Sequence, residues 1–462
     1  MAGQWYSKRT EELELLGLAG SHLTLGEDHE HKTAPLITRE AYLLTEPTHR
    51  PSQYGVLGAA LSVHEQNGKS DSPRDPRLYI NTNAPLSAIV CGVQGSGKSH
   101  TVSVLLENML IPRHAPIGNG EKALSGLVLH FGEGGPGSRP NETAWLGCAA
   151  SNGVRTPTVR VYVSRSALHT MQQVYAPLGK KVVIEPLLFS EAELDAEAFL
   201  SMMAVGSSDS APLYVQTILS ILRDLGEKFT YSKFQRELDD RKFNPAQRAG
   251  LEQRMALLKG FIDTKAGHRK KRFAAGQLTI IDLSDPFIDP AAACGLFEIV
   301  IRQFVRAHVG TGKVLVVDEA HKYLAANKGN SRLTKALLSL TRQQRHMAMR
   351  VLISTQEPTV VPPVLLDLCS VAILHRFSSP SWWDHVAKHV SANLSDEAFD
   401  QIVKLRTGEA IVLAPSGLGV FARRDADGAP AARELGQFGR RYLLVKTRQR
   451  VTTDGGASVL VV

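Results

Sequence analysis

The stretch Gly92-Val93-Gln94-Gly95-Ser96-Gly97-Lys98-Ser99 decides the fold, because it fits the phosphate-binding pattern G-x-x-x-x-G-K-[ST] in full. Its glycines let the backbone wrap around a phosphate and aim N–H groups at it. Lys98 is expected to reach the β- and γ-phosphates of ATP, and the Ser99 hydroxyl is expected to bind Mg²⁺. The predicted cofactor-binding set is Gly92, Val93, Gln94, Gly95, Ser96, Gly97, Lys98, Ser99 and His100.

The surroundings of this stretch favour a true phosphate loop over a glycine-rich turn without function. A β-type run, LSAIVCGV, leads into it, and residues 99–110 follow with helical spacing. A loop between a strand and a helix is the setting that the phosphate-binding pattern requires. His100, beside Ser99, is interpreted as a local structural residue.

A second motif, Val314-Leu315-Val316-Val317-Asp318-Glu319, ends an apolar run in two adjacent carboxylates. Open α/β sheets place their ligands at the carboxyl ends of the strands. We expect Asp318 to hold the Mg²⁺ shell and Glu319 to orient the attacking water or take its proton. In isolation such a pair is more often an exposed turn, but its combination with the phosphate loop favours ATP hydrolysis.

A third motif, Val351-Leu352-Ile353-Ser354-Thr355-Gln356, ends another apolar run in polar residues. The neutral amide of Gln356 is suited to orienting water or detecting the γ-phosphate. The alternative is a strand-end turn whose side chains only cap neighbouring backbone groups.

Strand and helix patterns alternate along most of the chain, which predicts an α/β fold with a mostly parallel, doubly wound sheet. We expect an N-terminal flank of uncertain fold at residues 1–77 and a RecA-like ATPase core at residues 78–425. Residues 190–265 are expected to be a helical insertion into that core, and residues 426–462 a C-terminal tail with one strand.

In their order, GVQGSGKS, VVDEAH and ISTQEP resemble the HerA–FtsK group of RecA-like P-loop ATPases, in particular its HerA-like helicase and translocase branch. The stretch from Leu338 to Ser379 carries most of this resemblance, and Leu405 to Ala414 resembles the Gly-Glu-Ala element of the group. The resemblance implies an additional strand, fitted by LTIIDLSD (Leu278 to Asp285). The HerA-like branch also has an N-terminal β-barrel, but the first 77 residues show no clear barrel periodicity.

The resemblance further implies ring hexamers that hold ATP at subunit interfaces, with an arginine from the neighbouring subunit completing each site. Arg376, which we expect to be buried, is the first choice for this catalytic arginine. Arg342 and Arg345 are the other candidates, and any of the three could equally be a solvated residue or part of an ordinary salt bridge.

The composition predicts a soluble intracellular protein of the cytoplasm or nucleus. The 462 residues are 43% hydrophobic and 21% charged, and no apolar run approaches the ~18 residues that a membrane span needs. The first residues lack the order of a secretory signal. Four scattered cysteines indicate a reducing compartment and neither a disulfide framework nor a metal site.

A net charge of +8 is compatible with a polyanionic partner. Two basic runs, His268 to Arg272 and Arg440 to Arg450, could neutralise phosphates or could be solvated surface. The segment with His321, Lys322 and residues 326–332 could project into a ring pore. Trp382 and Trp383 could stack on bases, although helical spacing places one of them in the core.

Together these patterns predict a Mg²⁺-dependent ATP hydrolase that translocates or remodels DNA as a ring oligomer, in a non-sequence-specific manner. One alternative is a nucleotide-gated scaffold or protein-remodelling ATPase that moves no nucleic acid. A small-molecule kinase is another, which the water-activating carboxylate disfavours.

Overall fold

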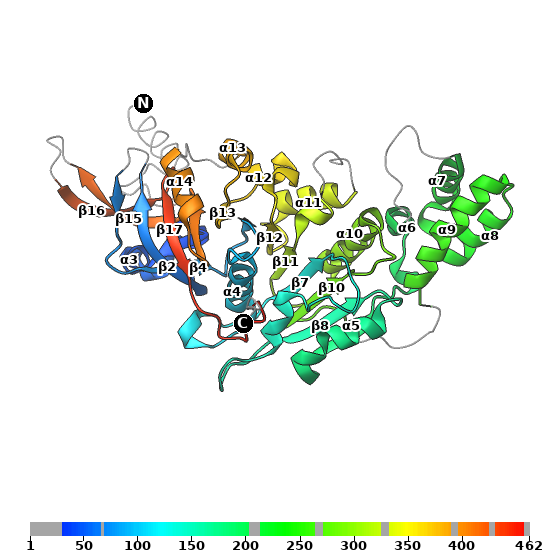
Figure 1. Ribbon diagram of the computed structural model, residues 1–462, viewed down its shortest axis with the longest axis horizontal. Coiled ribbons are helices and arrows are strands. Elements are labelled where there is room, and N and C mark those ends of the chain that lie inside the picture. The colour runs from blue at the N-terminus through cyan, green and yellow to red at the C-terminus, as the bar shows by residue number, and fades with distance from the viewer. Residues whose placement is uncertain are drawn as a thin grey trace, which may run out of the picture.

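The computed structural model describes residues 30–65, 69–202, 213–263, 271–324, 332–389, 396–424 and 430–456. These residues form one sheet of 17 strands, with helices on both faces of its parallel part (Figure 1). Within this part of the chain, no helix is both long and apolar enough to cross a membrane.

The parallel half of the sheet contains the strands that the sequence predicts to carry the nucleotide motifs. Apolar side chains run continuously along most of these strands, as expected where helices cover both faces. In spatial order they are β9 (Val182–Pro186), β8 (Thr158–Val163), β10 (Gln277–Asp282), β7 (Ser125–His130), β11 (Lys313–Val317), β12 (Met349–Thr355), β5 (Ser87–Cys91) and β13 (Val371–Leu374). The predicted parallel, doubly wound sheet is confirmed in this half.

The order of three of these strands positions the site. β12 lies between β5, which precedes the phosphate loop, and β11, which precedes the acidic pair. The carboxyl ends of parallel strands meet at one edge of a sheet. The glycine loop, the acidic pair and the polar end of β12 therefore lie side by side. The additional strand β10 is inserted farther along, between β7 and β8.

Two hydrophobic cores lie on the two faces of the parallel sheet. One contains side chains of α4 (Lys98–Leu110) and α5 (Leu168–Tyr175), and the other contains those of α10 (Pro290–Arg306) and α11 (Arg332–Gln343). The expected helical stripe of α4 is buried at Val102, Leu105, Leu106 and Met109. The remaining α-helices around the sheet are α3 (Arg39–Leu44), α12 (Pro363–Asp367), α13 (Pro380–His389) and α14 (Asp396–Lys404).

The expected helical insertion is present and lies at the opposite end of the molecule from β15 (Leu418–Arg424) and β16 (Pro430–Gln437) (Figure 1). It begins with a capping box, in which Ser190 and Glu193 cap each other's backbone at η5 (Glu191–Glu193). The helices that follow are α6 (Ala196–Met202), α7 (Leu213–Leu225), α8 (Tyr231–Asp239) and α9 (Pro245–Phe261). The other 3₁₀ helices of the described chain are η1 (Pro47–His49), η2 (Ala115–Ile117), η3 (Glu142–Gly147), η4 (Ala176–Lys181), η6 (Gly226–Lys228), η7 (Ala320–Lys322) and η9 (Pro358–Val360).

The other half of the sheet is almost entirely antiparallel and combines strands from both ends of the chain. Beyond β13 it continues through β14 (Glu409–Leu413), β17 (Tyr442–Thr447), β2 (Tyr54–His64), β4 (Arg77–Asn81), β1 (Leu36–Thr38), β15 (Leu418–Arg424) and β16 (Pro430–Gln437), while β3 (Ser70–Asp71) and β6 (Gly118–Asn119) pair with β2. The division of the chain into flank, core and tail remains a prediction, but strands of all three parts share this sheet.

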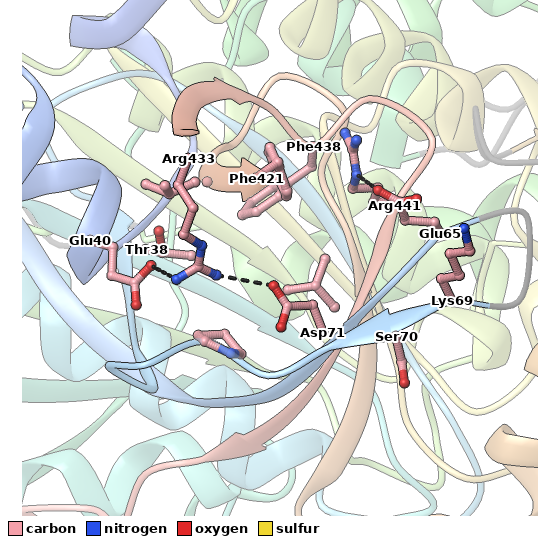
Figure 2. A pocket seen from close by; sticks show the side chains of 14 residues that line it. Thr38, Glu40, Glu65, Lys69, Ser70, Asp71, Phe421, Arg433, Phe438 and Arg441 are labelled. Atoms are coloured by element: carbon pink, nitrogen blue, oxygen red, sulfur yellow. Dashed lines mark hydrogen bonds and ion pairs between the residues drawn. The ribbon is translucent and has the colours of Figure 1, made fainter. Parts of the chain in front are cut away.

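A cavity of about 620 Å³ lies in the antiparallel half (Figure 2). Arg433 of β16 closes one side of it by pairing with Glu40 at 3.2 Å and with Asp71 at 3.0 Å. Arg441 lies 4.0 Å from the ring centroid of Phe421. The guanidinium group of Arg433 thus joins β16 to α3 and β3. No residue of the phosphate loop lines this cavity.

Candidate nucleotide-binding site

The phosphate loop connects β5 to α4, as the sequence predicts. Gly92, Gly95 and Gly97 all have positive φ, at 149°, 74° and 110°. A Cβ atom at Gly92 would lie 2.7 Å from that of His375, and one at Gly97 would lie 2.8 Å from the nitrogen of Gly408. Glycine is therefore required both for the backbone conformation and for the close packing of the loop.

The side chain of Lys98 lies buried inside this loop. Its Nζ donates a hydrogen bond to the carbonyl oxygen of Val93 at 3.1 Å. Burial lowers the pKa of Lys98, and the nearby carboxylates of Glu319 and Asp318 act in the opposite direction. The ammonium group thus lies in the electrostatic field of the acidic pair, which brings the first two motifs together.

Asp318 is buried at the end of β11 and held by two side chains. His130 Nδ1 donates to its Oδ2 at 3.0 Å, and Asn141 Nδ2 donates to the same oxygen at 2.8 Å. Burial alone would raise the pKa of Asp318, but hydrogen bonding from these two residues and the charge of His130 outweigh it and hold that pKa below its usual value. A carboxylate that stays ionised is suited to binding a metal cation.

His130 and Asn141 are site residues that the sequence analysis missed. His130 is the last residue of β7, so the rule that identified Asp318 at a strand end applies to it as well. Asn141 comes from a glycine-rich loop after β7, whose composition is typical of an exposed segment, yet Asn141 itself is buried. Nothing in the local sequence indicates its contact with Asp318.

Oxygen atoms suitable for Mg²⁺ are available beside the loop. The buried Ser354, at the end of β12, lies beside Asp318 and contributes to the lowering of its pKa. Mg²⁺ is usually held by one or two carboxylates together with substrate phosphates and waters. Ser99 and Asp318 fit that pattern. In the described chain no three His, Cys, Asp or Glu side chains form a metal cluster, as expected for this sparse type of site.

Glu319 has a left-handed backbone, with φ 51° and ψ 42°, which costs on the order of 1 kcal/mol for a residue other than glycine. Its Oε2 accepts a hydrogen bond from Gln356 Nε2 at 2.9 Å and lies 3.4 Å from His321 Nε2. The predicted water-activating carboxylate and the predicted sensor, on two adjacent strands, therefore touch. Lys98, Asp318, Glu319 and Gln356 form one constellation.

The decisive features are the glycine loop between β5 and α4, the acidic residues at the end of β11, and the polar end of β12 between them. The chain has a RecA-like P-loop fold. Its expected fold class is thereby confirmed from its own strand order and loop.

Comparison with known proteins gives distant similarities to this P-loop protein. No family model matches it. Over 101 residues, 22% of the chain, it is 29% identical to a protein of Methanocaldococcus jannaschii named probable helicase MJ1565. The match spans only 19% of that relative's own length.

The similar solved structures include VirB4 of Thermoanaerobacter pseudethanolicus, with 13% identity, coverage of 85% of this chain and 97% of that chain, and a TM-score of 0.44. The bacterial conjugative coupling protein TrwBdeltaN70 has 11% identity, coverage of 80% and 88%, and a TM-score of 0.41. The genome packaging NTPase B204 from Sulfolobus turreted icosahedral virus 2, in complex with AMP, has 10% identity, coverage of 71% and 92%, and a TM-score of 0.29.

The three candidate arginines lie at two opposite edges of the parallel sheet. Arg376 follows β13 at the carboxyl edge, and its carbonyl oxygen accepts a hydrogen bond from the Val93 N–H at 3.0 Å. The expectation that it is buried is wrong, because its side chain is exposed. Arg342 and Arg345 are also exposed, but they precede β12 and lie toward the opposite edge. Only Arg376 adjoins the site within its own chain.

The segment that resembles the Gly-Glu-Ala element packs against the phosphate loop. Gly408 N–H donates to the carbonyl oxygen of Ser96 at 3.0 Å. His375 links the two segments, with Nδ1 2.9 Å from the Glu409 carbonyl oxygen and Nε2 3.0 Å from the hydroxyl of Thr101. Burial lowers the pKa of His375 to about 4, so it is neutral at physiological pH.

The second basic run is not a free cationic surface. Arg448 pairs with the fully buried Glu107 of α4 at 2.6 Å, and Arg450 is bonded to Glu142. His100 also binds this C-terminal segment, donating from Nε2 to the Arg448 carbonyl oxygen at 2.8 Å. The hypothesis that Arg448 and Arg450 neutralise nucleic-acid phosphates is wrong, since both are used inside the protein. The structural role expected for His100 is confirmed.

The remaining nucleic-acid candidates are only partly visible. Residues 268–270 of the first basic run and residues 326–331 of the expected pore loop lie outside the described residues. Arg272 is half-buried and pairs with Glu193 at 3.0 Å. His321 and Lys322 both face Glu319. Trp383 is buried in the core, as predicted for one of the two tryptophans, and Trp382 is half-buried.

Proposed function

We propose that this protein is a Mg²⁺-dependent ATP hydrolase that acts as a motor, translocating or remodelling DNA as a ring of identical subunits, most simply a hexamer. The observation that carries the proposal is the convergence of Lys98, Asp318, Glu319 and Gln356 beside the phosphate loop. A protein that only bound nucleotide would not need a carboxylate placed against a polar sensor.

Phosphate binding is assigned to the loop and to the N-terminus of α4. The backbone N–H groups there and the positive end of the helix attract an anion. Lys98 would exchange its hydrogen bond with Val93 for a phosphate oxygen. Ser99 and Asp318 would hold Mg²⁺, which would neutralise charge on the phosphates. His130 and Asn141 keep the Asp318 carboxylate oriented.

Hydrolysis is assigned to Glu319 and Gln356. The Glu319 carboxylate would accept the proton of the attacking water or orient that water, as an acid in this position does in phosphoryl transfer. Gln356 now donates to the same carboxylate. An amide can form this bond in one state and contact phosphate or water in another. The pair would therefore couple the state of the nucleotide to β12.

DNA and the ring are supported by the resemblance of the motifs to the HerA–FtsK group and by the net charge of +8. The short match to a protein named as a helicase agrees with them. The exposed Arg376 at the site edge is available to a neighbouring subunit.

The direct test is the rate of ATP hydrolysis with and without single- and double-stranded DNA, for the wild type and for Glu319→Gln. We expect DNA to stimulate the wild type, and we expect the variant to bind ATP but hydrolyse it at least about 100-fold more slowly, the lower range of a lost general base.

The alternatives give different results in the same assay. Hydrolysis without DNA stimulation and without salt-dependent DNA binding would favour the nucleotide-gated scaffold. Transfer of phosphate to an added acceptor rather than to water would favour a kinase. The same hydrolysis rate in Glu319→Gln would exclude the proposed catalytic role of this residue.

A further inference from the structure

Tyr175, the last residue of α5, is a fully buried tyrosine whose hydroxyl group is bonded on two sides. It donates a hydrogen bond to Oδ2 of Asp282 at 2.7 Å and accepts one from the backbone N–H of Asn141 at 3.1 Å. Asn141 is the residue whose side chain binds Asp318. The hydroxyl therefore connects a buried carboxylate of β10 to a partner of the predicted metal-binding carboxylate.

The segment that leads to Asn141 has no helix or strand to fix it. Residues 132–140 form turns and irregular backbone between β7 and η3. At Asn141 itself, the carbonyl oxygen accepts a hydrogen bond from Ala144 N–H at 3.0 Å. Its side-chain oxygen accepts hydrogen bonds from the N–H and the hydroxyl of Thr143. The bonds of this one residue therefore determine where the irregular segment ends beside Asp318.

These bonds fix which end of the Asn141 amide faces the nucleotide site. The Thr143 N–H can only donate, so it binds the amide oxygen and leaves the NH₂ group for Asp318. An ionised carboxylate can only accept, which suits this orientation. Thr143 thus determines how the amide is turned, and the bond from the Asn141 backbone to Tyr175 determines where the residue stands.

Asp282 holds the other side of the tyrosine hydroxyl and is itself fixed at the end of β10. It is 2% exposed, and its Oδ1 accepts the N–H of Ser284 at 3.0 Å. In the sheet Asp282 lies opposite His130 of β7, and β7 pairs in turn with β11. Two strand spacings make on the order of 10 Å, so the backbones of Asp282 and Asp318 are too far apart for direct contact. A hydrogen-bonded path through other residues is needed to join them.

The hydroxyl of Tyr175 keeps its proton. Burial, and after it the negative charge of Asp282, raises the pKa of Tyr175 well above its usual value. The hydroxyl can therefore donate to the carboxylate while its oxygen accepts from the Asn141 N–H.

We propose that Tyr175 and Asp282 are positioning residues of the ATPase, which hold Asn141 in the place from which it orients Asp318 for Mg²⁺. The hydrogen bonds run from the additional strand β10, through the end of α5 and the loop after β7, to the end of β11. Neither residue would touch the nucleotide or the metal ion. This inference rests on the proposed function and deepens it by naming residues that determine its Mg²⁺ affinity.

The alternative is that Tyr175 only packs α5 against the sheet, since its ring belongs to the hydrophobic core on that face. Tyr175→Phe separates the two roles, because it keeps the ring and removes only the hydroxyl. In that variant the buried Asn141 N–H and the Asp282 carboxylate each lose a partner.

The test measures the Mg²⁺ concentration that gives half-maximal binding of a fluorescent, non-hydrolysable ATP analogue to the full chain. We expect Tyr175→Phe to raise this concentration about 5-fold, less than the ~10-fold expected on losing a direct partner such as Asn141. Asp282→Ala should act in the same direction, because it removes the acceptor that holds the hydroxyl. Binding of the analogue without Mg²⁺ should be the same in all these proteins.

A double variant shows whether Tyr175 acts through Asn141. Tyr175→Phe combined with Asn141→Ala should need no more Mg²⁺ than Asn141→Ala alone, because the path is already broken. Tyr442→Phe is the matched control. Tyr442 is also buried, and its hydroxyl donates to Gln401 at 3.3 Å, but it lies in the antiparallel half. This control should leave the Mg²⁺ dependence unchanged.

The outcomes separate this inference from the proposed function. If the wild type does not bind the analogue, or binds it independently of Mg²⁺, the proposed function fails and this inference with it. If the wild type depends on Mg²⁺ but Tyr175→Phe and Asp282→Ala keep its half-saturation, the positioning role is wrong and the proposed function stands. Additive effects in the double variant would also overturn the inference, since Tyr175 would then act independently of Asn141.

Discussion

Asp318 is held by the buried Asn141 and the half-buried His130, and its dependence on Asn141 can be measured. Asn141→Ala removes one of the two donors to its Oδ2. We expect a higher Mg²⁺ requirement and about 10-fold slower ATP hydrolysis, the usual lower range for losing a partner of a metal-binding residue. Asn119→Ala is a control, because Asn119 is exposed and its amide binds only the Ser52 carbonyl oxygen.

A purely structural role for Asn141 would produce a different pattern. Its loss would then lower the melting temperature but leave the Mg²⁺ dependence of the remaining activity unchanged. Titrating Mg²⁺ at saturating ATP distinguishes the two cases.

His375 gives the protein a predictable sensitivity to acid. Its pKa is lowered by burial to about 4 in the folded chain, against an ordinary value of 6.5. Between these values the unfolded chain binds a proton that the folded chain does not, so stability falls as the pH drops through this window. From pH 7 to pH 5 this single group should cost about 2 kcal/mol of unfolding free energy.

The comparison uses His375→Gln, which cannot titrate. Denaturant unfolding of both proteins at pH 7 and pH 5 isolates the contribution of His375, because the other titrating groups are shared. Equal losses of stability in the two proteins would contradict the prediction.

Much of the site could be predicted from the sequence because its residues follow apolar strands. Gly92 to Ser99, Asp318, Glu319 and Gln356 all do so, and parallel strands deliver such residues to one edge. Asn141 could not be predicted in this way. Its position depends on the path of a loop that has no periodicity, and only tertiary contacts fix that path.

At the scale of elements, the C-terminal segment after β17 packs against α4, the helix that follows the phosphate loop, and is bonded to its buried Glu107. Glu107 of α4 also accepts hydrogen bonds from the backbone N–H groups of Val451 and Thr452. Arg448 and Arg450 balance its charge. The basic run of the sequence does not reveal this, because charge patterns alone cannot show which arginines find a buried partner.

We expect Arg450→Ala to cost about 3 kcal/mol of unfolding free energy, because it leaves Glu142 without its cation and the buried Glu107 with Arg448 alone. Arg450 is only 1% exposed. Chemical denaturation measures the loss, and Arg440→Ala in the same basic run is the control, since Arg440 is exposed and should change stability by less than about 0.5 kcal/mol. A loss of DNA affinity in Arg450→Ala without destabilisation would contradict this assignment.

The strands themselves were predictable where apolar runs mark them, and less so at the edge of the sheet. β16 was not predicted, because its sequence PAARELGQ has little apolar pattern and its strand pairs only with β15. β4 lies at the start of the core expected at residues 78–425, yet it pairs antiparallel with β1 and β2, which lie in the expected flank. A short apolar run indicates that a strand forms, but it does not indicate which strands will pair with it.

For the whole molecule, the open question is how the exposed Arg376 is used. It lies beside its own phosphate loop, through the bond between its carbonyl oxygen and Val93, yet its side chain points to no partner in the described chain. In a ring with heterologous interfaces, each subunit's site faces a different surface of its neighbour. We expect Arg376 to act on the neighbouring site and Arg376→Ala to slow hydrolysis about 1,000-fold, as for other arginines of this kind.

Mixing two inactive variants decides between a neighbour's arginine and an internal one. Lys98→Ala subunits cannot bind phosphate but keep Arg376, whereas Arg376→Ala subunits keep the phosphate loop. If Arg376 acts between subunits, co-refolded mixed rings should regain activity at about a quarter of their interfaces, where an intact loop meets an intact arginine. If Arg376 acts within its own subunit, no interface is restored and the mixture stays inactive. Arg342→Ala, changed at the other edge of the sheet, should remain active alone and need no such rescue.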